Sequence, residues 1–126
     1  MKITGFDHIV LSCHNVSAMV DFYSDVLGMR TGEERPGKFA IWFGSCKISL
    51  QDEAHKPNLA RATTPGSGNF CVLTNLDIAD VAQTLKAKDV AILAQGPRDG
   101  ATGPIQSVYF NDPEGNLVEI AQQVAS

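Results

Sequence analysis

The chain has 126 residues, with 10 basic and 14 acidic side chains and a formal net charge of −4. At this length we expect one domain, 1–126, that buries roughly two-thirds of its unfolded surface. No apolar run approaches the roughly 18 residues of a membrane span, and the first residues lack the apolar core of a signal peptide. The mildly acidic balance, without a Lys/Arg cluster, argues against nucleic acid or an anionic membrane as the main partner.

The three cysteines, Cys13, Cys46 and Cys71, form an odd set without a C-x-x-C pair. Each lies in an apolar or strand-like stretch. This placement favours buried, reduced thiols over a disulfide framework or a zinc site. A cytoplasmic protein is therefore expected.

The chain begins with a predicted strand followed by a predicted helix. Residues 3–12 alternate as a strand does, which places His8 and Val10 on the same face. Apolar residues then recur at spacings of three and four, which predicts an amphipathic helix. Gly28 stands where a left-handed helix cap is expected. The apolar residues of this helix are Val16, Met19, Val20, Tyr23, Val26 and Leu27.

Three short strands are predicted after this helix. They span about 29–34, 38–43 and 46–52, and Gly44-Ser45 between the last two is typical of a hairpin turn. Residues 53–67 break all periodicity and indicate a loop. The first half of the chain thus has the order βαβββ.

The second half repeats this order. A strand over 69–75 precedes a helix, and three further strands are predicted at 90–95, 105–111 and 116–122. The segments 96–104 (GPRDGATGP) and 112–116 (DPEGN) separate these strands as a loop and a turn. The helix is indicated by Ile78, Val81, Ala82 and Leu85 at i, i+3, i+4 and i+7.

A half of this size cannot cover its own sheet face, so the two halves are expected to depend on each other. The predicted fold is α+β. Two βαβββ modules, about 1–53 and 68–126, are joined by the loop 54–67. They are expected to form one curved, mixed eight-stranded sheet with helices outside and a cleft inside.

Four polar residues occupy matching places in the two halves: His8, Gln51, Asn69 and Glu119. Glu119 shares a strand face with Leu117 and Ala121, and an unpaired buried carboxylate is costly unless it has a cation, a metal or an acid–base role. The alternative is that this face meets solvent. Because the repeat would carry all four residues to one cleft, the sequence predicts a site for a first-row divalent ion, which would act as a Lewis acid.

Two longer motifs carry a family resemblance. FDHIVL-x-CHNV-x(4)-DFY-x-x-VLGM near the start and NDPEGNLVEI near the end resemble the vicinal oxygen chelate superfamily of glyoxalases, bleomycin resistance proteins and extradiol dioxygenases. ISLQDEAH and TPGSGNFCVLT are most similar to its small glyoxalase-domain, virulence-type (lactoylglutathione lyase-like) members. The resemblance implies paired βαβββ modules, usually in a homodimer, with up to four metal ligands, one from each module end.

By this resemblance His8 and Glu119 match the ligands of the first and last strands. Gln51 stands where relatives have a carboxylate or His, and its amide oxygen is a weaker ligand. Asn69 replaces a His of the family, so the full set of four is absent. His8, Gln51 and Glu119 with water still make a reasonable site for Ni, Mn, Zn or Fe, whereas a two-ligand site would leave a metal-free protein.

The other candidate residues are substrate contacts. Arg98 is expected in a loop, where it would bind a carboxylate or phosphonate; a solvated loop charge is the equal alternative. His55 in the central loop would be an acid–base group or an extra ligand, and an exposed histidine without such a role is the favoured alternative. His14 is expected to be an exposed loop residue. The expected substrate-binding residues are Asn69, Arg98, Tyr109, Trp42 and His55.

The function expected from these residues is that of a glyoxalase-like divalent-metal lyase or isomerase. It would chelate two oxygens of a small substrate, with Glu119 as ligand and catalytic base. A metal-free small-molecule or antibiotic-binding resistance protein is the alternative that Asn69 favours. An extradiol dioxygenase is the second alternative, although Asn69 removes the second His of its triad. No residue supports dependence on glutathione.

Overall fold

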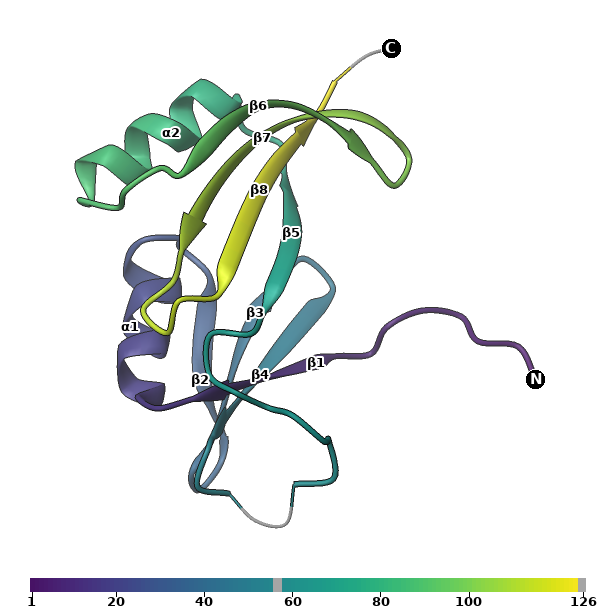
Figure 1. Cartoon of the computed structure of the whole chain (residues 1–126), viewed down its shortest axis with the longest axis vertical. Coiled ribbons are helices and arrows are strands. Elements are labelled where there is room, and N and C mark those ends of the chain that lie inside the picture. Colours follow the sequence, from purple (N-terminus) through teal and green to yellow (C-terminus); the bar gives the residue numbers. More distant parts are fainter. Residues whose placement is uncertain (56–57, 125–126) are drawn as a thin grey trace. The chain divides into compact units, whose positions relative to one another are not determined.

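The computed structural model describes residues 1–55 and 58–124, which divide into two compact units, Met1–Gly66 and Ser67–Ser126. Each unit contains one helix and one four-stranded mixed sheet in the order βαβββ (Figure 1). The predicted pair of βαβββ modules is confirmed. The described strands form two sheets of four, however, in place of the single eight-stranded sheet that was expected. Within the described residues, no helix combines the length and apolar character that a membrane crossing requires.

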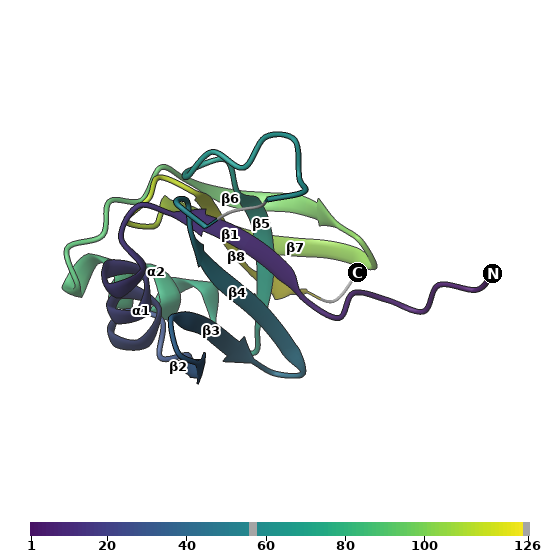
Figure 2. The ribbon, with the colours of Figure 1, turned by 90° about the horizontal axis from the view of Figure 1, so that it is seen from below.

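The sheet of the first module has a parallel pair of strands at one edge. Its strands lie in the order β1-β4-β3-β2, and the β1–β4 pair is parallel while the other pairs are antiparallel. A helix joins β1 to β2 and covers one face of this sheet (Figure 2). The elements are β1 (Ile9–Cys13), α1 (Val16–Asp25), β2 (Arg30–Arg35), β3 (Lys38–Phe43) and β4 (Cys46–Asp52).

Alternation along the strands separates the two faces of this sheet. Ile48 and Leu50 of β4 are almost fully buried, as are Met19 and Tyr23 of α1, the helix that contacts this strand. Burying a side chain of this size contributes about 1.5–3 kcal/mol, so the helix-covered face supplies most of the packing energy of the module. Gly28 has a φ of 67°, which confirms the predicted left-handed position after the helix.

The first strand is shorter than the sequence predicted. It begins at Ile9, and residues 3–8 lie outside the sheet although they alternate in polarity. Ile9 pairs with Ile48 of β4, and β4 itself begins only two residues earlier, at Cys46. In this register β4 reaches back only as far as Asp7, so residues 3–6 have no partner on this strand, and residues 3–8 are exposed.

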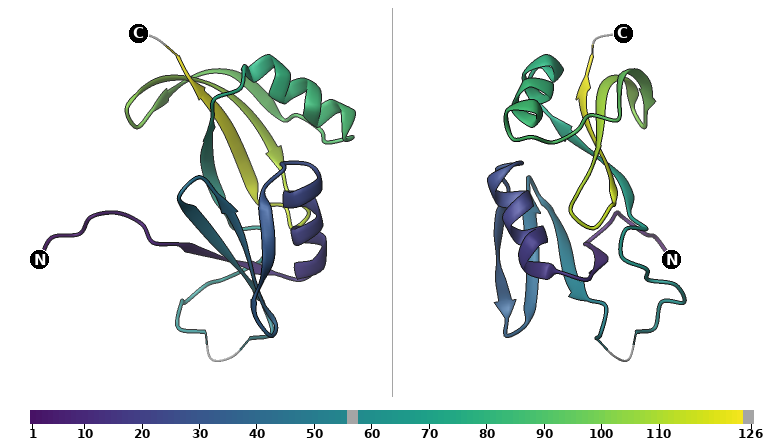
Figure 3. Two further views of the ribbon diagram at one scale, coloured as in Figure 1. Left: turned by 180° about the vertical axis from the view of Figure 1, so that it is seen from behind. Right: turned by 60° about the vertical axis from the view of Figure 1, so that its left-hand side comes forward.

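The second module repeats the architecture with the strand order β5-β8-β7-β6. The β5–β8 pair is parallel and the others are antiparallel. Figure 3 shows α2 along one face of this sheet, and all four predicted apolar residues of the helix are buried. The elements are β5 (Asn69–Thr74), α2 (Ile78–Ala87), β6 (Ala94–Gly100), β7 (Gly103–Asn111) and β8 (Leu117–Gln123).

The sequence misplaced β6. The predicted strand at 90–95 and loop at 96–104 are replaced by a strand over 94–100 and a tight turn at Ala101-Thr102. Gly96 and Pro97 argued for a loop, but β6 is an edge strand, where a residue without an N–H is tolerated. Arg98 consequently lies on a strand and not in a loop.

The turn at 112–116 is held by buried side chains. Asp112 Oδ1 accepts hydrogen bonds from the backbone N–H groups of Glu114 and Asn116, each at 3.0 Å. Asn116 donates its Nδ2 to Asp112 Oδ2 at 2.8 Å and accepts from the backbone N–H of Gly68 at 2.7 Å. The DPEGN motif therefore fixes the start of β8 against the segment that enters β5.

The prediction of free thiols is confirmed for all three cysteines, but the prediction that they are buried is correct only for Cys13. Cys13 is buried, whereas Cys46 and Cys71 are exposed, and all three are free thiols. Cys71 pairs with Glu119 on the sheet face that α2 does not cover, and Cys46 begins β4 beside the hairpin turn. An apolar strand context did not distinguish the helix-covered face of a sheet from its open face.

Candidate functional site

The open face of the first sheet collects the polar residues that the helix does not cover. On β4, Lys47, Ser49 and Gln51 alternate with the buried Ile48 and Leu50, so they lie on the face opposite α1. Val10 of β1 pairs with Ser49, and His8 lies two residues before it on the same side.

These residues line a hollow of about 200 Å³ in the first module. His8 and Gln51, two of the predicted metal ligands, are both in its wall. The sequence analysis missed its cationic residues, although alternation along 46–52 already placed Lys47 with Gln51. The lining residues are His8, Val10, Glu34, Arg35, Lys38, Phe39, Lys47, Ser49, Leu50 and Gln51.

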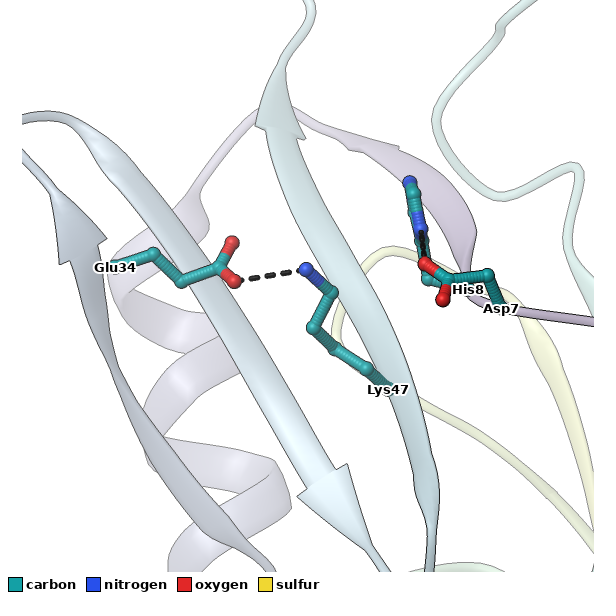
Figure 4. Close-up of polar contacts among 4 residues, drawn as sticks. All are labelled: Asp7, His8, Glu34 and Lys47. Atoms are coloured by element: carbon teal, nitrogen blue, oxygen red, sulfur yellow. Dashed lines mark hydrogen bonds and ion pairs between the residues drawn. The ribbon is translucent and has the colours of Figure 1, made fainter.

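The imidazole of His8 is oriented by its neighbour in sequence. Its Nδ1 lies 2.8 Å from Asp7 Oδ2 (Figure 4), and this hydrogen bond lowers the pKa of the Asp7 carboxyl, as does the nearby imidazole charge. When the ring is neutral, an Nδ1–H that donates to Asp7 leaves the lone pair of Nε2 available. In metal sites a ligating imidazole commonly donates its other ring N–H to a carboxylate, which fixes the orientation of the ring.

A salt bridge crosses the open face beside His8. Lys47 Nζ lies 2.8 Å from Glu34 Oε1 (Figure 4). The two side chains are 26% and 30% exposed. Glu34 comes from β2 and Lys47 from β4, so the pair spans the intervening strand β3.

In the second module the polar residues surround Glu119. This half-buried carboxylate accepts a hydrogen bond from the hydroxyl of the fully buried Ser107, with Oγ and Oε2 2.6 Å apart. On the flanking strands, Cys71 and Tyr109 pair directly with Glu119. Partial burial, the carboxylate charge and a hydrogen bond to Glu119 raise the pKa of the Cys71 thiol to about 11.

Arg98 reaches the same group from the edge strand. Its guanidinium carbon lies 5.2 Å from the centre of the Tyr109 ring, and its Nη1 donates to the carbonyl of Pro97 at 2.7 Å. Partial burial and a hydrogen bond to Glu119 raise the pKa of Tyr109, while Arg98 opposes this shift. Arg98, Tyr109 and Glu119 therefore form one polar cluster with Ser107 on the open face of the second sheet.

The remaining predicted residues are more separate. Asn69 is exposed at the start of β5, and Trp42 is half-buried on β3 with Arg30 stacked 4.4 Å above its ring centre. His55 is exposed just after β4. His14 is exposed as predicted, and its Nδ1 contacts the Glu53 carboxylate.

The predicted ligands thus fall into two groups. His8 and Gln51 share the hollow of the first module, and Glu119 lies in the polar cluster of the second. Over 1–55 and 58–124, no three His, Cys, Asp or Glu side chains form a group that could hold a metal ion. A site there would have to include neutral donors such as the Gln51 amide. Sequence reasoning missed Asp7 and Ser107, which orient His8 and Glu119.

Comparison with known proteins agrees with this architecture. The family described as the Glyoxalase/Bleomycin resistance protein/Dioxygenase superfamily matches residues 5–120. The virulence protein STM3117 of Salmonella typhimurium is 39% identical over 98% of this chain and 88% of that protein. Its crystal structure, 37% identical, superposes with a TM-score of 0.92 over 98% of this chain and the whole of that one.

Two further relatives widen the comparison. A glyoxalase domain-containing protein, RDO1 of Mycosarcoma maydis, is 35% identical over 96% of this chain and 69% of its own length. The metallothiol transferase FosB of Staphylococcus haemolyticus is 28% identical over 94% of this chain and 83% of its own. The chain therefore belongs to the glyoxalase/bleomycin resistance protein/dioxygenase superfamily.

Proposed function

We propose that the chain is a glyoxalase-like divalent-metal enzyme that acts on a small oxygenated substrate by chelating two of its oxygens. The observation that carries the proposal is the His8 imidazole, which Asp7 orients so that Nε2 is available, in a hollow that the Gln51 amide also lines. A relative named as a metallothiol transferase supports the same class of chemistry.

The donor set is compatible with a first-row divalent ion. His8 would supply an imidazole nitrogen, Gln51 an amide oxygen and Glu119 a carboxylate oxygen, with water completing the coordination. Nickel, manganese, zinc and iron all accept such ligands. The ion, when bound, would supply Lewis acidity toward a substrate carbonyl.

The side chains of the second module would move the proton. Ser107 engages Oε2 of Glu119, so we assign Oε1 as the atom that takes a proton from the substrate carbon. The stacked pair of Arg98 and Tyr109 would orient the substrate beside this carboxylate. Asn69, Trp42 and His55 stay proposed substrate contacts.

A metal-free binding protein is the second candidate. Asn69 stands where metal-binding relatives are expected to have His, and the described residues hold no cluster of three His, Cys, Asp or Glu side chains. The same open faces would then hold a small molecule by packing and hydrogen bonds.

Metal binding separates the two candidates. Protein purified without an affinity tag should contain near-stoichiometric metal, and the apo form should bind one of Ni²⁺, Mn²⁺ and Zn²⁺ in a titration. His8→Ala and Glu119→Gln should each weaken binding by more than about 100-fold, because each removes a direct ligand. Asp7→Asn removes only the partner of the imidazole and should cost about 10- to 100-fold.

His14→Ala is the matched control, because His14 is also an exposed histidine next to a carboxylate. It should bind metal as the unmodified protein does. If folded His8→Ala and Glu119→Gln proteins bind metal as tightly as the unmodified chain, the proposed ligands are wrong. If no form binds metal, the binding-protein candidate takes precedence.

A further inference from the structure

We propose that the hollow of the first module recognises an anionic group, a carboxylate or a phosphate, on a small molecule. This inference rests on the proposed function only where it calls that molecule the substrate. It assigns Arg35 and Lys38 as the residues that contact the anion.

The first support is the charge in the wall of the hollow. Three of the chain's 10 Lys and Arg residues line it, Arg35, Lys38 and Lys47, against a single acidic residue, Glu34. The chain as a whole has a net charge of −4, so this local excess of positive charge opposes the overall composition. Focused positive charge in a hollow attracts small anions.

The second support is how these charges are paired. Glu34 neutralises Lys47 in the salt bridge described above. Among the described residues, Arg35 and Lys38 take part in no salt bridge, and they lie directly opposite each other across the β2–β3 ladder. Like charges in opposite positions destabilise a strand pair, and an anion held between them would remove that repulsion. A guanidinium beside an ammonium also suits the two oxygens of a carboxylate or phosphate.

The third support is the volume of the hollow and the presence of proposed metal ligands in its wall. A volume of about 200 Å³ corresponds to roughly seven water molecules, so the occupant is a small molecule and not a polymer. Because His8 and Gln51 line the same hollow, one small ligand can contact the cations and the proposed metal ligands together. The substrate class is then a small acid whose further oxygens reach those ligands.

The test is an NMR titration of ¹⁵N-labelled protein with small anions. The protein is first freed of metal with a chelator, and the chelator is then removed. Pyruvate and inorganic phosphate should shift the amide signals of residues that line the hollow, and neutral hydroxyacetone should not. Tighter binding of pyruvate assigns a carboxylate, and tighter binding of phosphate assigns a phosphate; either result supports the proposal.

The double variant Arg35→Gln/Lys38→Gln should raise the Kd of the better anion by at least about tenfold, because two charge-assisted contacts are lost. Arg61→Gln/Lys86→Gln removes the same two charge types at exposed positions outside the hollow and should leave the Kd unchanged. The single variant Arg35→Lys keeps the positive charge and should retain most of the affinity of the unmodified protein for the anion. The amide spectrum itself shows whether each variant is folded.

The proposal is overturned if hydroxyacetone binds as well as pyruvate, or if the Arg35/Lys38 variant and its control lose affinity equally. Shifts confined to amides outside the hollow would overturn it too. Because no metal is present, these outcomes are independent of the metal titration. A failed ligand assignment for His8 and a failed anion site can therefore be distinguished.

Discussion

Glu119 contributes to raising the pKa of both a thiol, Cys71, and a phenol, Tyr109. Cys71 and Tyr109 flank it on neighbouring strands, and its negative charge opposes deprotonation of both. Partial burial makes the largest contribution to the raised pKa of the Cys71 thiol, and the charge and hydrogen bond of Glu119 add to it, so that this pKa reaches about 11. An exposed cysteine is often reactive, but the nucleophile is the thiolate. Partial burial together with the neighbouring carboxylate therefore protects this thiol.

Alkylation should reveal this protection. With a pKa of about 11, Cys71 is only ~0.1% thiolate at pH 8, so iodoacetamide should modify it slowly. Its rate should rise about tenfold for each pH unit up to about pH 10. Glu119→Gln removes the charge and should speed labelling at pH 8. Mass spectrometry resolves Cys71 from Cys46, and equal rates in the two proteins would contradict the assigned role of the carboxylate.

The turn between β7 and β8 shows what holds an element in place. Asn116 is almost fully buried and connects Asp112, within its own turn, to Gly68 at the entrance of β5. The two ends of this connection are far apart in sequence. The parallel pair β5–β8 is therefore aligned by a side chain as well as by its ladder.

Asn116→Ala should lower the free energy of unfolding by about 2–4 kcal/mol, because the part-buried Gly68 N–H and the buried Asp112 Oδ2 both lose a partner. Asn75→Ala, at an exposed position after β5, should stay within about 0.5 kcal/mol of the parent. Urea unfolding monitored by circular dichroism measures both. A loss below about 1 kcal/mol for Asn116→Ala would mean that water replaces the missing bonds.

Periodicity predicted most elements because each sheet has one covered face. The strands at 38–43 and 46–52 were predicted with the bounds that β3 and β4 have, and the apolar stripe of α2 was predicted residue by residue. The errors occur where the presence or absence of a neighbouring strand decides whether a segment joins the sheet. Residues 3–6 lack a partner strand, and β6 tolerates Pro97 because it lies at an edge.

The candidate site was predictable only in part. His8 and Glu119 were indicated by their places in the repeat and by the family motifs. Asp7, Ser107 and the cations of the hollow were not, since their roles depend on cross-strand register and on which face each strand presents. The exposure of Cys71 was missed for the same reason.

At the scale of the whole molecule the charge is divided unevenly. Residues 1–66 contain seven basic and seven acidic side chains, whereas residues 67–126 contain three basic and seven acidic ones. The whole net charge of −4 thus belongs to the second module. The cation-lined hollow lies in the electrically balanced module, where no net negative charge of its own module opposes an anion.

Metal binding should also appear in the stability of the whole chain. An ion that binds only the native state adds about 2.7 kcal/mol when its concentration is 100 times the Kd. The melting temperature of the unmodified protein and of His14→Ala should therefore rise on addition of the metal that the apo protein prefers. His8→Ala should show no rise. A similar rise in all three proteins would place the ion elsewhere.

The two-residue turn between β6 and β7 limits how this hairpin can change in length. A Cβ on Gly100 would lie 2.7 Å from the carbonyl oxygen of Gly103, so the turn has little room to adjust. One residue inserted between Arg98 and this turn would reverse the faces of the strand and carry the guanidinium away from Tyr109. Two inserted residues would return the guanidinium to the face of the sheet that carries Tyr109. Where the stacked pair matters to function, evolution can lengthen this edge strand only in even steps.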